Sequence, residues 1–283
     1  MLGKRQVGIA IAGLVLIVAT ALALAGCGSS GLSGTATLSG STTVQPMAQE
    51  AADQFTKKNP SANVTVQGGG SSVGITQVSE GTVNIGDSSR ELKDEEKNLG
   101  LVDHKVAFDV IVLIANPGAS VKSLTGDQVK GIFTGTITNW SQVGGADGTI
   151  TVVTRDSASG TREMFDEKAL GSTKDKPVKL VSGAIEANSN GVMRQKVAST
   201  KGAVGYISYG YLDNSVKALQ YNGVAGNLQT GLDQTYPLSR YLHMFTKGAA
   251  TGLTKAYIDF VLSPDFQNTT VSKEYIPMTK VKQ

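Results

Sequence analysis

Short strand-like segments alternate with helix-like segments along most of the chain, and this order limits the possible folds more than any other feature. The apolar residues of 44–58 recur at helical spacing, and Asn59-Pro60 ends that pattern. In order, the elements predicted for this part are a strand at 36–39, a helix at 44–58, a strand at 63–67, a helix at 73–80 and a strand at 83–86. Strands that alternate with helices indicate an α/β fold.

The same alternation continues beyond residue 100. Residues 106–115 form a continuous apolar run that only Asp109 interrupts, which is typical of a buried strand. A helix with a capping-type start is predicted at 121–133, and Trp140 in the turn after it is expected to be a packing residue. A strand at 151–154 precedes a helix near 163–169. The 283 residues suffice for about two domains of ~100–200 residues each.

Composition excludes several classes of protein. Only 17% of the residues are charged and no basic stripe is evident, which argues against a nucleic-acid binder. A single Cys excludes a disulfide framework and a Cys-rich metal cluster, and two His argue against a His-rich zinc site. The 34 Gly residues, with many Ser and Thr, suggest a surface rich in hydroxyl and backbone hydrogen-bond donors.

The N-terminus has the features of an export signal. Lys4 and Arg5 precede the uncharged stretch 7–25, and the small residues before Cys27 resemble the lipobox of bacterial-type lipoproteins. We expect a signal peptide at 1–26, with a lipid on Cys27. The alternative is an uncleaved signal anchor with an incidental Cys. Both place everything after residue 27 outside the cytoplasm.

Removal of the signal would leave a nearly neutral protein. Without Lys4 and Arg5 the formal charge of +3 falls to +1. Residues 27–34 then form the lipidated Cys and a short flexible tether.

Three turns rich in Gly, Ser and Thr join a strand end to a helix start. They are residues 40–43, 68–72 and 155–162, the last with Arg at both ends. A helix N-terminus presents unpaired N–H groups and a partial positive charge, Gly permits close approach, and Arg offers a planar cationic fork. Each turn alone is also compatible with ordinary helix capping. The three together predict an anion site.

These motifs, in this order, resemble one family. Residues 40–46 (GSTTVQP), 69–75 (GGSSVGI), 85–92 (IGDSSREL) and 155–162 (RDSASGTR), together with 201–208 and 275–278, look like the phosphate-binding lipoprotein of the phosphate ABC importer (PstS-type). The resemblance covers essentially all of 35–280. It implies a two-lobed periplasmic-binding-protein fold of type II-like form, in which two α/β lobes joined by two crossing segments hold the ligand in a cleft.

The resemblance also implies a function. Such a protein captures inorganic phosphate outside the cytoplasm, is anchored to the cell membrane by its lipid, and delivers phosphate to an ABC-type membrane permease. It implies a monomer that is not an enzyme and that has no cofactor and no metal. Carried over by position, the phosphate-binding residues are Ser41, Thr42, Thr43, Ser71, Ser72, Arg155, Ser159, Gly160 and Thr161, with the contact of Arg162 left open.

One position departs from the family pattern. Many members have a Gly-x-Ser-Asp turn whose carboxylate accepts the phosphate proton, and here the last position is Ser89. A hydrogen-bond acceptor in the site favours phosphate, which carries a proton, over sulfate, which does not. We expect Asp87 or Asp156 to supply this acceptor, with the Ser89 hydroxyl as a weaker substitute. Either carboxylate can instead bond the backbone of its own turn.

The chain path predicts the lobes. Asn116-Pro117-Gly118 is the expected first crossing, and the return lies near 236–242. Lobe 1 would combine 35–115 with 238–283, and lobe 2 would be 116–237. The alternative is one continuous α/β domain with surface loops.

Other functions have weaker support. Another tetrahedral oxyanion or a phosphorylated small molecule is the nearest alternative ligand. Residues 70–74 match Gly-x-Ser-x-Gly, so a serine hydrolase would use Ser72, with His104 or His243 as its base. His243 lies in a strand-like segment and is expected to be a core or interface residue. No Gly-Lys-Ser/Thr sequence occurs, so no nucleotide hydrolysis is expected.

Overall fold

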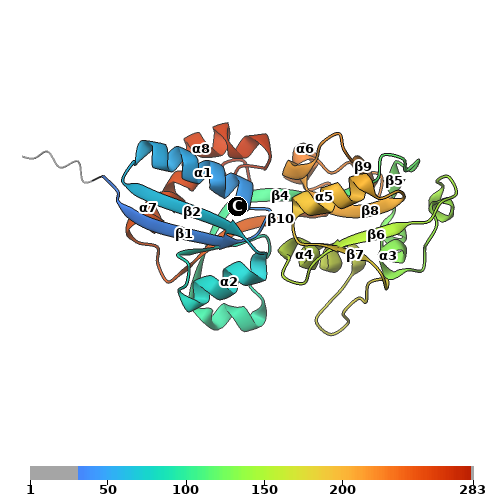
Figure 1. Ribbon diagram of the computed structural model, residues 1–283, viewed down its shortest axis with the longest axis horizontal. Helices are drawn as coiled ribbons and strands as arrows, with labels where there is room; N and C mark the ends of the chain where they lie inside the picture. Colours follow the sequence, from blue (N-terminus) through green and yellow to red (C-terminus); the bar gives the residue numbers. More distant parts are fainter. Residues whose placement is uncertain (1–30, 282–283) are drawn as a thin grey trace, which may run out of the picture. The chain divides into compact units, whose positions relative to one another are not determined.

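The computed structural model describes residues 31–281, which form an α/β structure around one extended sheet (Figure 1). The strands are β1 Gly34–Gly40, β2 Ala62–Gly68, β3 Ile85–Ser88, β4 Leu101–Ala115, β5 Ser123–Leu124, β6 Thr151–Arg155, β7 Ile185–Ala187, β8 Ala203–Ser208, β9 Lys217–Tyr221 and β10 Ser239–Lys247. The helices are α1 Gln45–Lys58, α2 Ser71–Glu80, α3 Gly126–Thr134, α4 Gly160–Leu170, α5 Asn190–Ser199, α6 Leu228–Leu232, α7 Gly252–Leu262 and α8 Pro264–Thr269. Short 3₁₀ segments lie at Asp94–Leu99, Trp140–Val143, Tyr209–Tyr211 and Val271–Lys273.

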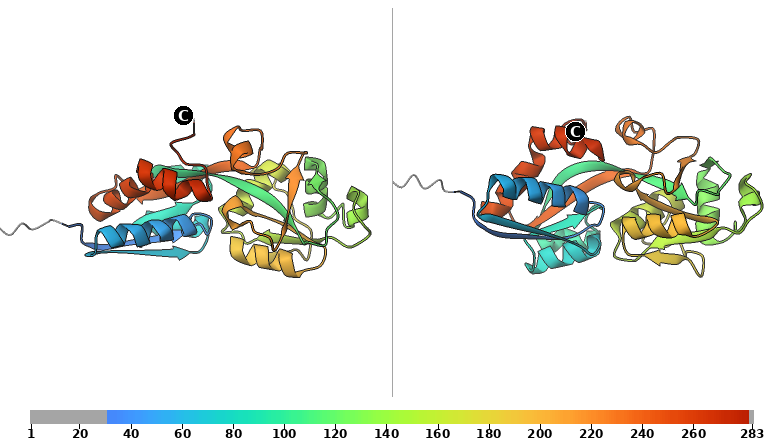
Figure 2. Two further views of the ribbon diagram at one scale, coloured as in Figure 1. Left: turned by 90° about the horizontal axis from the view of Figure 1, so that it is seen from above. Right: turned by 45° about the horizontal axis from the view of Figure 1, so that its top comes forward.

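The long strand β4 connects two groups of strands. The sheet order is β2-β1-β3-β10-β4-β8-β6-β7, and β9 pairs with both β4 and β5. The first part of β4 pairs antiparallel with β10, and its last five residues pair with β8. Figures 1 and 2 show β4 and β10 passing between a group built on β1 and β2 and a group built on β6 and β8.

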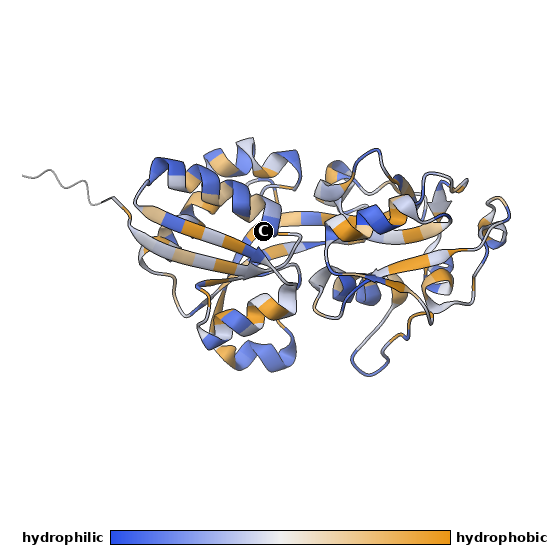
Figure 3. Cartoon of the chain, in the orientation of Figure 1, coloured by the Kyte–Doolittle hydropathy of each residue, from blue (hydrophilic) through white to orange (hydrophobic). Residues whose placement is uncertain are grey.

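Helix α1 illustrates how the sequence determines the first group. Pro46 occupies the first turn, where its missing N–H costs nothing, and Lys57 and Lys58 lie in the last turn. Its apolar face is buried in a core with β1 and α7; the buried residues are Met47, Ala48, Ala51, Ala52 and Phe55. Figure 3 shows the resulting mixture of hydrophilic and hydrophobic segments on α1. The predicted helix at 44–58 is confirmed.

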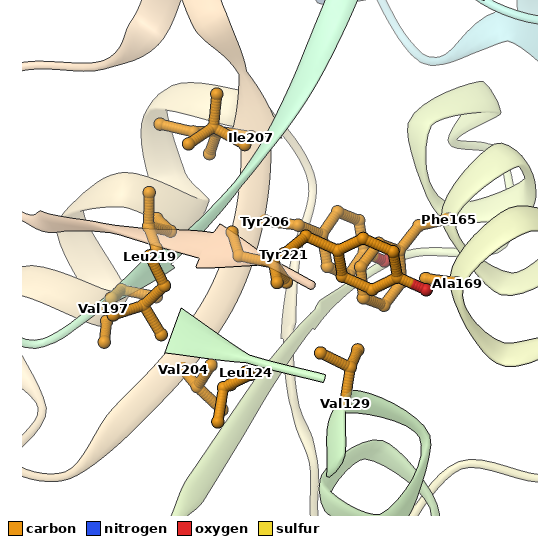
Figure 4. Close-up of a cluster of buried hydrophobic side chains, with 14 of the residues drawn as sticks. Leu124, Val129, Phe165, Ala169, Val197, Val204, Tyr206, Ile207, Leu219 and Tyr221 are labelled. Atoms are coloured by element: carbon orange, nitrogen blue, oxygen red, sulfur yellow. The ribbon is translucent and has the colours of Figure 1, made fainter. Parts of the chain in front are cut away.

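The second group has its own hydrophobic core. Phe165 of α4 stacks on Tyr206 of β8, with ring centroids 3.9 Å apart (Figure 4). Trp140 is buried in the same core, and its indole N–H donates to the carbonyl of Gly202 at 3.1 Å. Its predicted packing role is confirmed.

Two predicted elements differ most from the structure in their bounds. Strand β4 starts at Leu101 instead of residue 106, because its polar first half pairs with β10. The predicted helix at 121–133 is wrong at its start. Ser123–Leu124 form β5, with Leu124 buried, and α3 begins only after Thr125, whose hydroxyl accepts from the Gln128 N–H at 3.2 Å.

The predicted signal peptide at 1–26 and the lipid site Cys27 lie outside the described residues. Among the helices of 31–281, none combines the length and the apolar character needed to cross a lipid bilayer.

Candidate functional site

The three predicted turns meet at one place. Thr43 Oγ1 lies 3.0 Å from Thr161 Oγ1, although 118 positions separate them in sequence. The Ser72 N–H donates to the carbonyl of Ala158 at 3.2 Å. The site thus lies where β1, β2, β3 and β6 end and where α2 and α4 begin.

The first turn has three hydroxyl side chains: two bond to other elements, and the third stabilises the turn. Gly40 has φ +133°, and a Cβ there would lie 2.2 Å from the carbonyl oxygen of Asp87. The Ser41 hydroxyl accepts from the Thr43 N–H at 3.2 Å and so supports the turn. The buried hydroxyls of Thr42 and Thr43 bond to side chains from other elements.

The second turn brings α2 against β3 and α4. Gly69 and Gly70 both have positive φ, which favours glycine. Ser71, at the start of α2, is buried, and its Oγ accepts from the Ser89 N–H at 3.0 Å and lies 3.3 Å from Ser89 Oγ. Ser72 points elsewhere, because its Oγ accepts from Arg90 Nη2 at 3.2 Å.

The third turn caps α4. The Ser159 hydroxyl accepts from the Arg162 N–H at 3.2 Å, so it serves as the N-cap. Gly160 follows at the first helical position, where an added Cβ would lie 2.4 Å from Ser71 Oγ. Only glycine allows α4 and α2 to approach so closely.

Arg155 ends β6 as the largest fully buried side chain of the third turn. Its Nε donates to the carbonyl of Ala187 at 3.0 Å, and its Nη2 donates to Thr42 Oγ1 at 3.2 Å and to the Asn188 carbonyl at 3.3 Å. Its Nη1 is buried without a hydrogen-bond partner. The guanidinium of Arg162, in contrast, is engaged within its own helix and turn. It donates to Asp166 at 2.7 Å and to the Arg155 carbonyl at 2.8 Å.

A second buried arginine was not predicted. Arg240 of β10 donates to Asp109 Oδ2 through Nε at 3.1 Å and through Nη2 at 2.9 Å. The same Nη2 lies 2.9 Å from Thr161 Oγ1 and 3.3 Å from Thr43 Oγ1, whereas Nη1 is buried without a partner. A sequence signal existed, because Asp109 is the only charge in the apolar run 106–115 and a buried carboxylate needs a partner.

Asn190 was also missed. It is the first residue of α5, and its Nδ2 donates to Thr43 Oγ1 at 3.0 Å. Its Oδ1 accepts from the Ser208 N–H at 3.1 Å, which fixes the amide. Ser208 Oγ in turn donates to Asp109 Oδ1 at 2.6 Å. No Gly-rich turn marks this residue, so its role follows only from the tertiary structure.

The electrostatics favour a small anion. Burial lowers the pKa of Arg155, and the nearby charge of Arg240 lowers it further, although Tyr206 and Asp156 oppose this. Burial likewise lowers the pKa of Arg240, while Asp109 raises it. Two buried guanidinium groups that each keep an unpartnered Nη1 cost free energy unless an acceptor is present. An oxyanion between the threonine hydroxyls would satisfy them.

The two candidate carboxylates do not bond to these groups. Asp87 pairs across the ladder with Met244, whose side chain lies in the core beneath α1, so Asp87 shares that face. Both its oxygens lack partners, and burial raises its pKa well above the ordinary value of 3.8. Asp156 Oδ1 accepts from the Ala158 N–H at 3.0 Å, within its own turn.

Comparison with known proteins agrees with this geometry. The family model described as a PBP superfamily domain matches residues 26–265. Phosphate-binding protein PstS of Bacillus subtilis (strain 168) is 40% identical over 95% of this chain and 94% of its own length. The chain belongs to the PBP superfamily and, within it, to the PstS family.

Solved structures of related proteins share the fold. A crystal structure with bound phosphate of an ABC transporter substrate-binding protein from Clostridium perfringens has a TM-score of 0.82 and 36% identity, covering 87% of this chain and all of that one. An ABC-type phosphate transport receptor from Vibrio cholerae has a TM-score of 0.72 and 35% identity, covering 86% and 100%. The predicted family and the two-lobed α/β fold are confirmed.

The hydrolase alternative is not supported. The PstS family consists of transport receptors. Because the chain belongs to this family, the expectation that the protein is not an enzyme is confirmed. The geometry agrees: Ser72 Oγ bonds to Arg90, and His243 Nδ1 bonds to Asp103.

Proposed function

We propose that this protein is an extracytoplasmic solute-binding protein that captures inorganic phosphate and delivers it to an ABC-type membrane permease. One observation carries the proposal: Arg155 and Arg240 are buried side by side with threonine hydroxyls, and each keeps an unpartnered Nη1. The names of the relatives supply the ligand, since one is a phosphate-binding protein and another was crystallised with phosphate. Another tetrahedral oxyanion or a phosphorylated small molecule is the alternative.

The proposed contacts follow from which groups point inward. Thr42, Thr43, Thr161 and the two arginines would donate from side chains, and Gly160 from its N–H at the helix start. Ser71 and Ser89, whose hydroxyls lie beside Gly160, would complete the site. Ser41 and Ser159 shape their turns, and Ser72 holds Arg90, so we assign these three supporting positions beside the ligand.

We also propose the predicted lobe division, 35–115 with 238–283 against 116–237. Two separate hydrophobic clusters support a division into two lobes, one cluster containing Val106 and Leu242 and the other containing Val110 and Leu238. Because residues 110–115 and Leu238 pack in the core of the second lobe, the crossings would lie within β4 and β10 instead of at residues 115 and 238. Phosphate would bridge turns from both lobes and stabilise the closed state. The lipid on Cys27, the tether 27–34, attachment to the cell membrane and a monomeric state complete the proposal.

Isothermal titration of the full-length protein in detergent tests the function. After co-purified ligand is removed by unfolding and refolding, phosphate should bind at one site. Replacing Arg155 with Gln should weaken binding about 10- to 100-fold, because a hydrogen bond to a charged group contributes about 1.5–3 kcal/mol and 1.4 kcal/mol is tenfold.

The control is Lys174→Gln, which removes the same charge from a side chain that is 82% exposed, and it should bind as the wild type does. Titrations with sulfate, arsenate and molybdate identify the alternative oxyanions. Absence of phosphate binding in the refolded wild type would refute the proposal.

For the phosphate proton we favour Ser89 as the acceptor. Asp156 is engaged in its turn, and Asp87 lies on the core side of the ladder with Met244, where burial raises its pKa. Ser89→Ala should therefore lower the ratio of phosphate to sulfate affinity about tenfold, since an unpaired buried group costs about 1–3 kcal/mol.

Asp87→Asn and Asp156→Asn are the comparison variants, and each should keep the wild-type ratio. If one of them lowers the ratio while Ser89→Ala does not, a carboxylate is the acceptor and the assignment to Ser89 is wrong.

A further inference from the structure

A groove of 1140 Å³ is lined by residues of both groups of strands and reaches the anion site at Arg240. Most of its charged groups are paired: Arg90 bonds to Glu96, and Glu163 lies 3.0 Å from Arg90 and 3.2 Å from Lys93. His243 also lines the groove, and its imidazole is not fully paired. This histidine has no role in the proposed phosphate site.

The imidazole of His243 is held rigidly. Its side chain is 1% exposed, and its ring stacks on Phe245 with an interplanar angle of 5°. Nδ1 lies 2.8 Å from Asp103 Oδ1, so the Nδ1–H donates to the carboxylate. Nε2 is buried without a hydrogen-bond partner and lies 3.7 Å from Glu91 Oε1.

This arrangement matches the environment of a metal-binding histidine. In such sites a carboxylate accepts the N–H of one ring nitrogen, which fixes the tautomer and leaves the other nitrogen free to bind metal. Asp103 occupies the position of that orienting carboxylate. Nε2 then offers its lone pair toward Glu91, which supplies a carboxylate oxygen.

The distances also suit a metal ion. Zinc binds imidazole nitrogen at about 2.0–2.1 Å and carboxylate oxygen at about 2.0–2.2 Å, so two tetrahedral ligands lie roughly 3.4 Å apart. The separation of 3.7 Å between Nε2 and Glu91 Oε1 is close to this value. One ligand atom from each of Glu91, Asp103 and His243 falls within 4.8 Å of the others.

We propose that His243 Nε2 and Glu91 bind a divalent transition-metal ion of the zinc type, with Asp103 as the positioning residue and water completing the coordination. Imidazole and carboxylate ligands suit Zn²⁺, Co²⁺ and Ni²⁺. Glu91 is 65% exposed, so the ion has access from the groove. The competing account is an imidazolium that forms ion pairs with both carboxylates and binds no metal.

Two measurements on the full-length protein in detergent separate these accounts. Titration with Zn²⁺ alone, without phosphate, should show one site. His243→Gln and Glu91→Gln should each weaken binding at least about tenfold, and Asp103→Asn about 10- to 100-fold, the usual effect of losing an orienting partner. His104→Gln is the matched control, because His104 is the other histidine of the chain and bonds to Thr246.

Imidazole ¹⁵N NMR gives the second readout, since only two histidines contribute signals. We expect a neutral His243 with the proton on Nδ1, whose Nε2 resonance shifts on addition of Zn²⁺. Glu91→Gln keeps the test valid if His243→Gln fails to fold, because Glu91 is at the surface. Equal Zn²⁺ affinity in Glu91→Gln and His104→Gln, or an imidazolium whose signals ignore Zn²⁺, would overturn the proposal.

Discussion

Replacing Gly160 with Ala is expected to weaken phosphate binding at least about a hundredfold. The new Cβ would lie 2.4 Å from Ser71 Oγ, 2.9 Å from Ser71 Cβ and 3.0 Å from Ser89 Oγ. These atoms come from turns that must meet around the ligand, so α4 would have to move away from α2 and β3. Two or more contacts to a charged ligand, at about 1.5–3 kcal/mol each, would be lost. Isothermal titration measures the loss.

Gly148→Ala is the matched control. A Cβ at Gly148 meets nothing within 4 Å and its φ is not positive, so affinity should stay at the wild-type value. Thermal unfolding without ligand should be similar for both variants, because separation of the two turns relieves the clash. Wild-type affinity in Gly160→Ala would show that the turns do not close on the ligand.

Removing either member of the Asp109–Arg240 ion pair is expected to destabilise the protein by about 3–5 kcal/mol. Both side chains are almost fully buried, so each single change leaves a charge without its partner. Burial already raises the pKa of Asp109, and the guanidinium of Arg240 is the main opposing influence. Asp109→Leu and Arg240→Met, compared by urea unfolding without phosphate, measure the effect.

The double variant separates stability from binding. Asp109→Leu with Arg240→Met removes both charges, and apolar replacement of a buried pair is often neutral or stabilising. We expect its free energy of unfolding to exceed that of either single variant, whereas phosphate affinity stays lost because Arg240 Nη1 is gone. A double variant that binds phosphate normally would exclude Arg240 from the site.

The local elements near the anion site could be predicted because their signals are local. Helical spacing over 44–58 and the breaker Asn59-Pro60 determine α1 without reference to the rest of the chain. The three turns are likewise marked by Gly and Ser at strand ends. The start of β4 could not be found, because residues 101–105 have no alternating pattern and form a strand through their pairing with β10.

The site was predicted only in part for the same reason. Arg155 and the threonine hydroxyls lie in recognisable turns, whereas Arg240 and Asn190 reach Thr43 from elements far away in sequence. Alternation placed Asp87 on the same side as Ser89, but the ladder pairs it with Met244 on the core side. Residue spacing gives the periodicity of a strand but not which of its faces meets the ligand.

The continuity of β4 and β10 between the two cores determines how the molecule can bend. The boundary between the cores falls within unbroken strands, next to the Asp109–Arg240 register pair. A loop hinge concentrates rotation at a few bonds, whereas a two-stranded ribbon spreads it as a change of twist along its length. Opening would then twist the two strands elastically. The Asp109–Arg240 ion pair would keep the two strands in register during this motion.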